Sequence, residues 1–340
     1  MRQVTKKLVV AFVIASTLLL AFSGVVGAQS KEFKLGVLYS MTGAFAPAGA
    51  LGGYRGTMVA VDMINAKGGI AGQYKVVPVV ADAQSNPDVA IREGQRLMTV
   101  ENVPVVLGVF SSAIAVPLAP MAEKNKKIFW ITIAISDKVL EDRHLKYVFR
   151  PQPMGSNWAA GVDMVKEYCS KFGYSDPKQI RVAVLHEDGP YGVATSNASV
   201  NRLKEYGMNV VLTEAYSHKS NDLSPSILKL KAAKPDVILH TGYFPDVVLF
   251  FRQAREMGLK TKAIVGHGAG HSNFGPLKES LGSELMNYVL DIDPAPAQIL
   301  DPKKLAVGQG EIIQEFLKRY KGKFGEDDPP SHATQGFGHT

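Results

Sequence analysis

Four residues that follow two neighbouring apolar runs of the sequence could together bind an anion. Ser111 and Ser112 stand where a β-type run gives way to a helical pattern, and Ile135 and Ser136 come after the next β-type run. The free backbone N–H groups at a helix start attract negative charge, and a serine hydroxyl adds a further donor. Serine in such a place also serves as an ordinary helix N-cap that needs no ligand. Two such loops in succession favour a site for a small anion.

Three ring-bearing residues follow other apolar runs and could close this site from the opposite side. Tyr191 lies in the segment HEDGPYG, Tyr243 lies in TGYFP, and His267 lies in the glycine-rich segment GHGAGH. Two aromatic rings opposite two serine-bearing loops would form a clamp around a small molecule. The alternative is that each tyrosine packs only within its own domain and that His267 is an ordinary loop histidine.

The sequence patterns of common catalytic sites are missing from the chain. It contains no GxxxxGK[ST] phosphate loop, no GxSxG nucleophile motif, no HExxH zinc motif and no CxxC pair. His267 and His271 are four residues apart and could hold a metal ion on a helix, but the glycines between them indicate a loop. The sequence therefore predicts a binding protein that is not an enzyme and that uses no metal and no cofactor.

The elements that must position these residues alternate along the chain. Short β-rich apolar runs alternate with longer helical patterns from residue 33 onward, which is typical of a doubly wound α/β protein with parallel sheets. In such sheets ligands bind beyond the carboxyl ends of the strands. We expect strands at residues 34–39, 75–80, 105–109, 128–133, 180–185, 209–212, 237–240 and 263–266. We expect helices at residues 56–67, 87–101, 113–125, 156–171, 191–206, 223–233 and 245–258.

Two breaks in composition divide the 340 residues into two units. The segment RPQP at residues 150–153 forbids regular structure after an extended run, and a second stretch, rich in proline and acidic residues, covers residues 291–302. We expect one lobe made of residues 29–150 together with 292–340, and a second lobe made of residues 151–291.

The first 28 residues have the pattern of a cleaved signal peptide. Arg2, Lys6 and Lys7 precede an apolar run at residues 8–20, and small residues lead to Ala28. The alternative is a membrane anchor, which is disfavoured because about 15 apolar residues are fewer than the roughly 20 that span a bilayer. We therefore expect export to the periplasm.

The charge pattern argues against nucleic acid as a partner. The formal net charge of +7 falls to +4 when the three basic residues of the signal segment are removed. The remaining lysines and arginines are scattered singly, whereas nucleic-acid-binding proteins cluster them on one surface. The single cysteine, Cys169, cannot form a disulfide within the chain.

Several segments of the chain resemble the leucine/isoleucine/valine-binding proteins of branched-chain amino-acid ABC importers. The most distinctive is INAKGGI at residues 64–70. The resemblance covers residues 33 to about 270 and continues more loosely beyond. Other matching segments are FKLGV at 33–37, MTG at 41–43, Asp82, Gly108 with Ser111 and Ser112, DGPYG at 188–192, GYFPD at 242–246, RQAR at 252–255 and GLKT at 258–261.

The resemblance implies a type I periplasmic binding fold, in which two Rossmann-like lobes close on a ligand about a hinge and the transporter recognises the closed form. It also implies roles for individual residues. Ser112, Ile135 and Ser136 would hold the ligand carboxylate through hydroxyl and backbone N–H groups. Tyr191 and Tyr243 would be brought to the ligand by the second lobe.

Three departures from the family pattern modify these expectations. His267 stands where the leucine-binding members have an acidic residue that holds the ligand ammonium, and imidazole offers no full negative charge. An organic acid without an amine is therefore an alternative ligand. Ala48 stands near the position of an aromatic side chain of the relatives, which predicts a roomier pocket. Residues 331–340 are polar and glycine-rich, so we expect them to form no helix that returns to the first lobe, and the chain to be either a fragment or divergent from the family at its C-terminus.

The sequence thus predicts a monomeric periplasmic solute-binding protein that delivers an amino acid or a similar small carboxylate to the permease of an ABC importer. The open alternatives are a binding protein for aromatic or other organic acids, a cytoplasmic ligand-sensing regulator of the same fold, and an exported hydrolase. The signal segment disfavours the regulator, and the missing nucleophile pattern disfavours the hydrolase.

Overall fold

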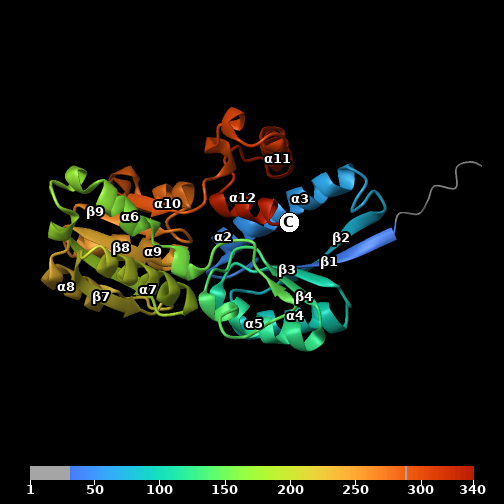
Figure 1. The fold of residues 1–340 in the computed structure, drawn as a ribbon, viewed down its shortest axis with the longest axis horizontal. Helices are drawn as coiled ribbons and strands as arrows, with labels where there is room; N and C mark the ends of the chain where they lie inside the picture. Colours follow the sequence, from blue (N-terminus) through green and yellow to red (C-terminus); the bar gives the residue numbers. More distant parts are fainter. Residues whose placement is uncertain (1–30, 288) are drawn as a thin grey trace, which may run out of the picture.

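The computed structural model describes residues 31–287 and 289–340, so the predicted signal peptide at residues 1–28 lies outside the described part of the chain. The described residues form two five-stranded sheets, and helices flank each of them (Figure 1). Every strand pair within the two sheets is parallel. The predicted α/β fold with two parallel-sheet lobes is confirmed. Among the described helices, none combines the length and apolar character needed to cross a bilayer.

The first sheet has the strand order β2-β1-β3-β4-β5. On one face, Leu38 and Phe129 are fully buried against Ile114 and Leu118 of a covering helix. Because parallel strands are covered on both faces, they appear in the sequence as continuous apolar runs. The strands are β1 (Lys31–Tyr39), β2 (Tyr74–Asp82), β3 (Val105–Gly108), β4 (Ile128–Ile131) and β5 (Val148–Phe149). The associated helices are α2 (Ala46–Ala48), the π-helix η1 (Gly49–Tyr54), α3 (Arg55–Ala66), α4 (Pro87–Thr99), α5 (Ser112–Asn125) and the 3-10 helix η2 (Asp137–Val139).

The second sheet has the strand order β10-β9-β8-β6-β7. Its two faces are covered by separate apolar clusters, one around Phe250 and the other around Val182. The strands are β6 (Arg181–Glu187), β7 (Asn209–Tyr216), β8 (Val237–Thr241), β9 (Ala263–His267) and β10 (Val289–Ile292). The helices are η3 (Gly155–Asn157), α6 (Ala160–Glu167), η4 (Cys169–Phe172), η5 (Pro177–Gln179), α7 (Pro190–Glu205), α8 (Ser224–Ala233), α9 (Phe244–Glu256), α10 (Phe274–Leu281) and η6 (Ser283–Met286).

The single helix predicted at residues 156–171 is divided in the structure. It consists of η3, α6 and η4, with interruptions at residues 158–159 and at Tyr168. Val162, Val165 and Cys169 nevertheless pack against one cluster of the second sheet. The apolar spacing is therefore continuous across the interruption at Tyr168, which is why the sequence pattern predicted one helix.

The chain leaves the first sheet after Phe149 and the second sheet after Ile292, and the sequence analysis recognised neither β5 nor β10 as a strand. β5 has only two residues, and β10 merges with the acidic, proline-rich stretch that we had interpreted as a break. After β10 come η7 (Ala297–Ile299), η8 (Pro302–Lys304), α11 (Gln309–Phe324) and α12 (Ser331–Gly338).

The expectation that residues 331–340 form no helix was wrong, because α12 covers most of this segment and packs on η1 and α3. The contact depends on glycines at both surfaces. A Cβ atom at Gly56 would lie 1.9 Å from the carbonyl oxygen of Ala333, and one at Gly336 would lie 2.2 Å from that of Gly53. Glycine thus serves close helix packing here, although its frequency in the sequence had suggested irregular structure. Figure 1 shows α12 beside the first sheet, although most of the chain separates α12 from the elements on which it packs.

Candidate functional site

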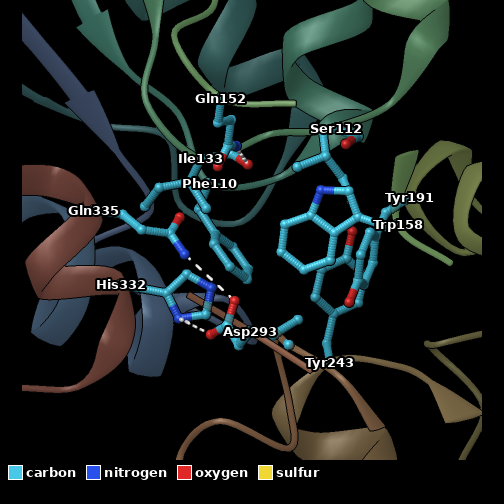
Figure 2. A pocket seen from close by; sticks show the side chains of 13 residues that line it. Phe110, Ser112, Ile133, Gln152, Trp158, Tyr191, Tyr243, Asp293, His332 and Gln335 are labelled. Carbon is cyan, nitrogen blue, oxygen red and sulfur yellow. Dashed lines mark hydrogen bonds and ion pairs between the residues drawn. The ribbon is translucent and has the colours of Figure 1, made fainter. Parts of the chain in front are cut away.

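A cavity lies between the two sheets, where the carboxyl ends of their strands face each other (Figure 2). Its lining side chains leave only about 30 Å³ of free volume, which is room for one or two water molecules and far less than the few hundred Å³ of a typical small-molecule site. A ligand must therefore displace side chains or separate the sheets as it enters. The cavity is lined by Phe110, Ser112, Ile133, Ile135, Gln152, Trp158, Tyr191, Tyr243, Gly268, Ala269, Asp293, His332 and Gln335.

The serines predicted to bind an anion lie together at the start of α5. Ser111 is the N-cap of this helix, and its hydroxyl accepts a hydrogen bond from the backbone N–H of Ala113 at 3.2 Å. The hydroxyl oxygen of Ser112 accepts one from the backbone N–H of Ser136 at 3.1 Å. Ser112 and Ile135 line the cavity, whereas Ser111 and Ser136 are buried beside it. The Ser112 hydroxyl keeps its own proton for donation to a ligand.

The two predicted tyrosines reach the cavity from the second sheet. Tyr191 lies in the first turn of α7, and its hydroxyl donates to the backbone carbonyl of His267, so the ring rather than the hydroxyl is available to a ligand. Tyr243 is the N-cap of α9, and its hydroxyl lies 3.4 Å from that of Ser111. Burial raises the pKa of both tyrosines well above 10, so both hydroxyls are protonated at neutral pH. Tyr243 thus contacts both sheets, whereas the hydrogen bond of Tyr191 stays within the second.

The ring of His267 lies behind the cavity and is not part of its lining. Nδ1 is 3.3 Å from the hydroxyl of Thr241 and Nε2 is 3.5 Å from that of Ser199. Burial lowers the pKa of His267 to about 4, so the imidazole is neutral at neutral pH. In this arrangement the His267 side chain contacts polar groups inside the second lobe and does not face the cavity.

Asp293 is a cavity residue that the sequence analysis missed. It follows β10, and its carboxylate accepts hydrogen bonds from the hydroxyl of Ser331 and, at 3.3 Å, from Nε2 of Gln335. Nδ1 of His332 lies 4.0 Å from Oδ2 (Figure 2). All three partners belong to α12, so the tail helix holds this carboxylate in place. The signal in the sequence was an acidic residue just after a strand, but it was hidden because β10 had not been recognised.

The polar groups around Asp293 leave its negative charge without a full counter-charge. Burial, together with the charge of Asp293, raises the pKa of Asp291 well above its usual value, which favours the neutral form of Asp291. Burial lowers the pKa of His332, although Asp293 opposes this effect, and His332 is neutral at neutral pH. The ion pairs among the described residues include none between Asp293 and a lysine or arginine. A cationic group of a ligand would be favoured beside this carboxylate.

Phe45 brings a buried aromatic ring of the first lobe against two rings that line the cavity. Its ring centroid lies 4.4 Å from that of Tyr243 and 6.0 Å from that of Phe110. The sequence analysis had predicted a roomier pocket because Ala48 replaces an aromatic residue of the relatives. Phe45, three residues earlier, occupies space in the first loop instead.

Glu187, Asp188 and His218 form a group whose potential metal-ligand atoms all lie within 4.8 Å of one another. The two carboxylate oxygens of Glu187 already accept hydrogen bonds from the backbone N–H groups of Gly189 and Gly192. Nδ1 of His218 lies 3.6 Å from Oε2 of Glu187, and this contact raises the pKa of His218. The group is therefore explained by the start of α7 and by a histidine–glutamate pair, without a metal ion.

Comparison with known proteins identifies the family to which this two-lobed architecture belongs. A family model described as periplasmic binding protein matches residues 32–339. The chain belongs to the periplasmic binding protein family. Leu/Ile/Val-binding protein homolog 7 of Brucella suis is 36% identical to this periplasmic binding protein over 310 residues, which are 91% of this chain and 75% of that protein.

Solved structures have the same fold at lower sequence identity. The branched-chain amino acid transporter substrate binding protein LivJ from Streptococcus pneumoniae, in complex with isoleucine, has a TM-score of 0.72 and 22% identity, covering 91% of this chain and 81% of LivJ. A solute binding protein from R. palustris in complex with benzoate has a TM-score of 0.73 and 17% identity, covering 90% and 78%. Periplasmic binding proteins bind small molecules, work with ABC transporter permeases and are not enzymes.

Proposed function

We propose that this periplasmic binding protein captures a small amino acid between its two lobes and delivers it to the permease of an ABC importer. The observation that carries the proposal is the distribution of charge in the cavity. Ser112 and the N-terminus of α5 supply hydrogen-bond donors for a carboxylate, and Asp293 supplies an anion for an ammonium group. Figure 2 shows Ser112 and Asp293 on opposite sides of the cavity.

Asp293 offers the negative charge that His267 lacks, so the presence of His267 no longer argues against an amino acid as the ligand. The acid that the family uses for the ligand ammonium is replaced at His267, but Asp293 reaches the cavity from a different strand. In this proposal Ser111, Ser112, Ile135 and Ser136 form the carboxylate end of the site. Tyr191 and Tyr243 cover the ligand, and His267 supports Tyr191 through its carbonyl group.

The mechanism that we propose is closure of two lobes, made of residues 29–150 with 292–340 and of residues 151–291. A ligand favours the closed state only to the extent that it binds that state more tightly than the open one. Contacts from both lobes to one small molecule provide this difference. We also propose that residues 1–28 are removed on export, so that the protein acts as a monomer in the periplasm.

The alternative ligand is an aromatic or other organic acid without an ammonium group. The aromatic lining of the cavity favours it, since Phe110, Trp158 and the two tyrosines could enclose a ring. The two ligand classes differ in what they require of Asp293. An amino acid needs the negative charge of this residue, whereas the charge would repel an organic acid.

The test is a binding screen of residues 29–340 by thermal shift and calorimetry with L-leucine, L-isoleucine, 4-methylpentanoate and benzoate. A ligand at 100 times its Kd should stabilise the protein by about 2.7 kcal/mol. We expect the amino acids to bind and Asp293→Asn to weaken them roughly 10- to 100-fold, because a charge-assisted hydrogen bond is lost. Ser112→Ala should weaken all carboxylates. Binding of benzoate or 4-methylpentanoate alone, unchanged or improved in Asp293→Asn, would overturn the amino-acid proposal.

A further inference from the structure

The backbone of Tyr243 is held by a buried carboxylate one turn further along α9. The N–H of Tyr243 donates to both carboxylate oxygens of Asp246, each at 3.1 Å. Asp246 is only 2% exposed, and its carboxylate lies beneath the turn that presents Tyr243 to the cavity. A buried carboxylate keeps its charge only where hydrogen bonds compensate for the water that it has lost. Here one of those bonds is made to a residue that lines the cavity.

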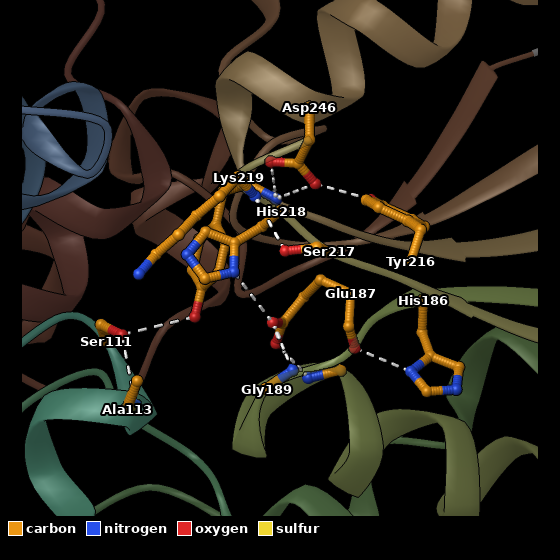
Figure 3. Close-up of polar contacts among 12 residues, drawn as sticks. Ser111, Ala113, His186, Glu187, Gly189, Tyr216, Ser217, His218, Lys219 and Asp246 are labelled. Atoms are coloured by element: carbon orange, nitrogen blue, oxygen red, sulfur yellow. Dashed lines mark hydrogen bonds and ion pairs between the residues drawn. The ribbon is translucent and has the colours of Figure 1, made fainter. Parts of the chain in front are cut away.

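A second hydrogen bond fixes Asp246 from strand β7. The hydroxyl of Tyr216, at the end of β7, donates to Oδ2 of Asp246 at 2.5 Å (Figure 3). The same hydroxyl lies 2.9 Å from Nε2 of His240 on β8. A tyrosine hydroxyl has one proton, so the proton given to Asp246 requires that Nε2 of His240 donates to Tyr216. The hydrogen bonds therefore run from His240 through Tyr216 to Asp246.

The network is packed tightly against the backbone that precedes Tyr243. A Cβ atom at Gly242 would lie 2.4 Å from the Tyr216 hydroxyl and 2.5 Å from Oδ2 of Asp246. Only glycine at this position leaves room for the hydrogen bond between those two side chains. A change in the network must consequently be transmitted to the turn that carries Tyr243.

We propose that Asp246 is a positioning residue for ligand recognition, which holds Tyr243 in the cavity and is itself held by the hydrogen-bond chain through Tyr216 to His240. This inference rests on the proposed function, because it takes Tyr243 to be a ligand residue. Tyr243 contacts Phe45 and Tyr191 and approaches Ser111, so its position determines how both lobes meet around a ligand.

The strength of this support depends on the protonation of Asp246. Burial raises the pKa of Asp246 to about 7, although the bonds from Tyr216 and from the backbone N–H groups oppose the rise. A neutral carboxyl group accepts a weaker hydrogen bond than a carboxylate does. Tyr243 is therefore held less firmly when Asp246 takes up a proton.

The other titratable groups near Asp246 come from three elements. Tyr216 and His218 belong to β7 and the loop that follows it, Glu187 ends β6, and His240 lies on β8. His218 favours the charged form of Asp246, since its positive charge lowers the pKa of the carboxyl group. Burial keeps Tyr216 protonated and His240 neutral around pH 7, so neither changes charge in this range.

A ligand-independent experiment can test the position of Tyr243. The chain contains 12 tyrosines, so ¹⁵N-tyrosine labelling gives few amide signals, and Tyr243→Phe identifies the one of interest. Because the pKa of His218 is raised from its usual value of 6.5 and its ring centroid lies 5.4 Å from that of Tyr243, the measurement is made in a His218→Gln background. There we expect the signal to shift with pH with a midpoint near 7 or above, and to stop titrating when Asp246→Asn is added. Tyr216→Phe should raise the midpoint. The matched control is Tyr174→Phe, which removes a similar bond, at 2.6 Å to Asp236, elsewhere in the lobe and should leave the midpoint unchanged.

The second part of the test measures L-leucine binding by calorimetry at pH 6 and pH 8. If the ionised form binds, the apparent affinity should fall up to about tenfold at pH 6, and Asp246→Asn should bind weakly at both values. An amide signal of Tyr243 that does not titrate, or that still titrates in Asp246→Asn, would overturn the inference. An affinity for leucine that is unchanged in Asp246→Asn would also overturn it. If leucine binds at neither pH while the amide titrates as expected, the amino-acid proposal fails and the positioning by Asp246 stands.

Discussion

Tyr243 and Phe45 face each other across the cleft between the two sheets, and their ring centroids lie 4.4 Å apart. Tyr243 follows β8 and Phe45 lies in the loop after β1, so the pair joins two parts of the chain that belong to different sheets. Both side chains are buried. The contact therefore contributes to the closed arrangement even without a ligand.

Phe45→Ala should shift the free protein toward an open arrangement. An aromatic pair contributes about 0.5–1.5 kcal/mol beyond the area that it buries, which corresponds to a change of roughly 2- to 10-fold in the closed population. We expect a larger radius of gyration by small-angle X-ray scattering and weaker ligand binding. Phe274→Ala is the control, because Phe274 is exposed. Identical scattering of Phe45→Ala and the wild type would show that the pair does not hold the lobes together.

His267→Glu should destabilise the protein and should not improve amino-acid binding. The side chain of His267 is surrounded by Thr241 and Ser199 rather than by the cavity, so the new carboxylate would be buried without a cation. Such burial costs several kcal/mol or forces protonation. Urea denaturation should show the loss, and His267→Gln, which keeps a polar neutral group, should lose less. A stable His267→Glu variant with increased leucine affinity would mean that this position does reach the ligand.

His271→Leu should stabilise the protein at neutral pH and reduce its sensitivity to acid. Both ring nitrogens of His271 are buried without a partner among the described residues, and burial lowers its pKa to about 3. In the unfolded chain His271 becomes protonated near pH 6.5, whereas in the folded chain it stays neutral until about pH 3. The contribution of His271 to stability therefore falls as pH drops from about 6.5 toward 3, by up to about 1.4 kcal/mol per pH unit.

Denaturation curves of the wild type and His271→Leu between pH 4.5 and 7.5 measure this effect. The raised pKa of Asp246 acts in the opposite direction, since its protonation favours the folded state as pH falls below about 7. Comparison of the two proteins cancels this contribution. The interpretation would be refuted by equal pH slopes in wild type and His271→Leu.

Gly56→Ala should loosen the attachment of α12. Its Cβ would lie 1.9 Å from a backbone oxygen of Ala333, so the helices must separate, at a cost of about 1–3 kcal/mol. Gly322→Ala is the matched control on α11, where a Cβ would meet no atom within 4 Å. It should stabilise by about 0.5–1 kcal/mol, because alanine favours a helix interior. If both substitutions changed the free energy of unfolding in the same direction relative to the wild type, the packing argument would be contradicted.

The sequence by itself determined the fold class and pointed to several residues that line the cavity. Apolar runs located most strands because buried parallel strands need apolar side chains on both faces. The strand ends then identified Ser112, Ile135, Tyr191 and Tyr243, all of which line the cavity, since ligand sites in such sheets lie beyond those ends. These are local signals, which a single sequence contains in full.

Only the tertiary structure decided how distant segments complete the site. Asp293 reaches the cavity after a short strand that local patterns did not reveal, and its partners come from α12. Whether residues 331–340 form a helix depended on glycines at both surfaces, one of them in α3. His267 stands at a strand end but turns toward Thr241. Side-chain direction and close helix contact depend on neighbours that are remote in sequence, and no local pattern records them.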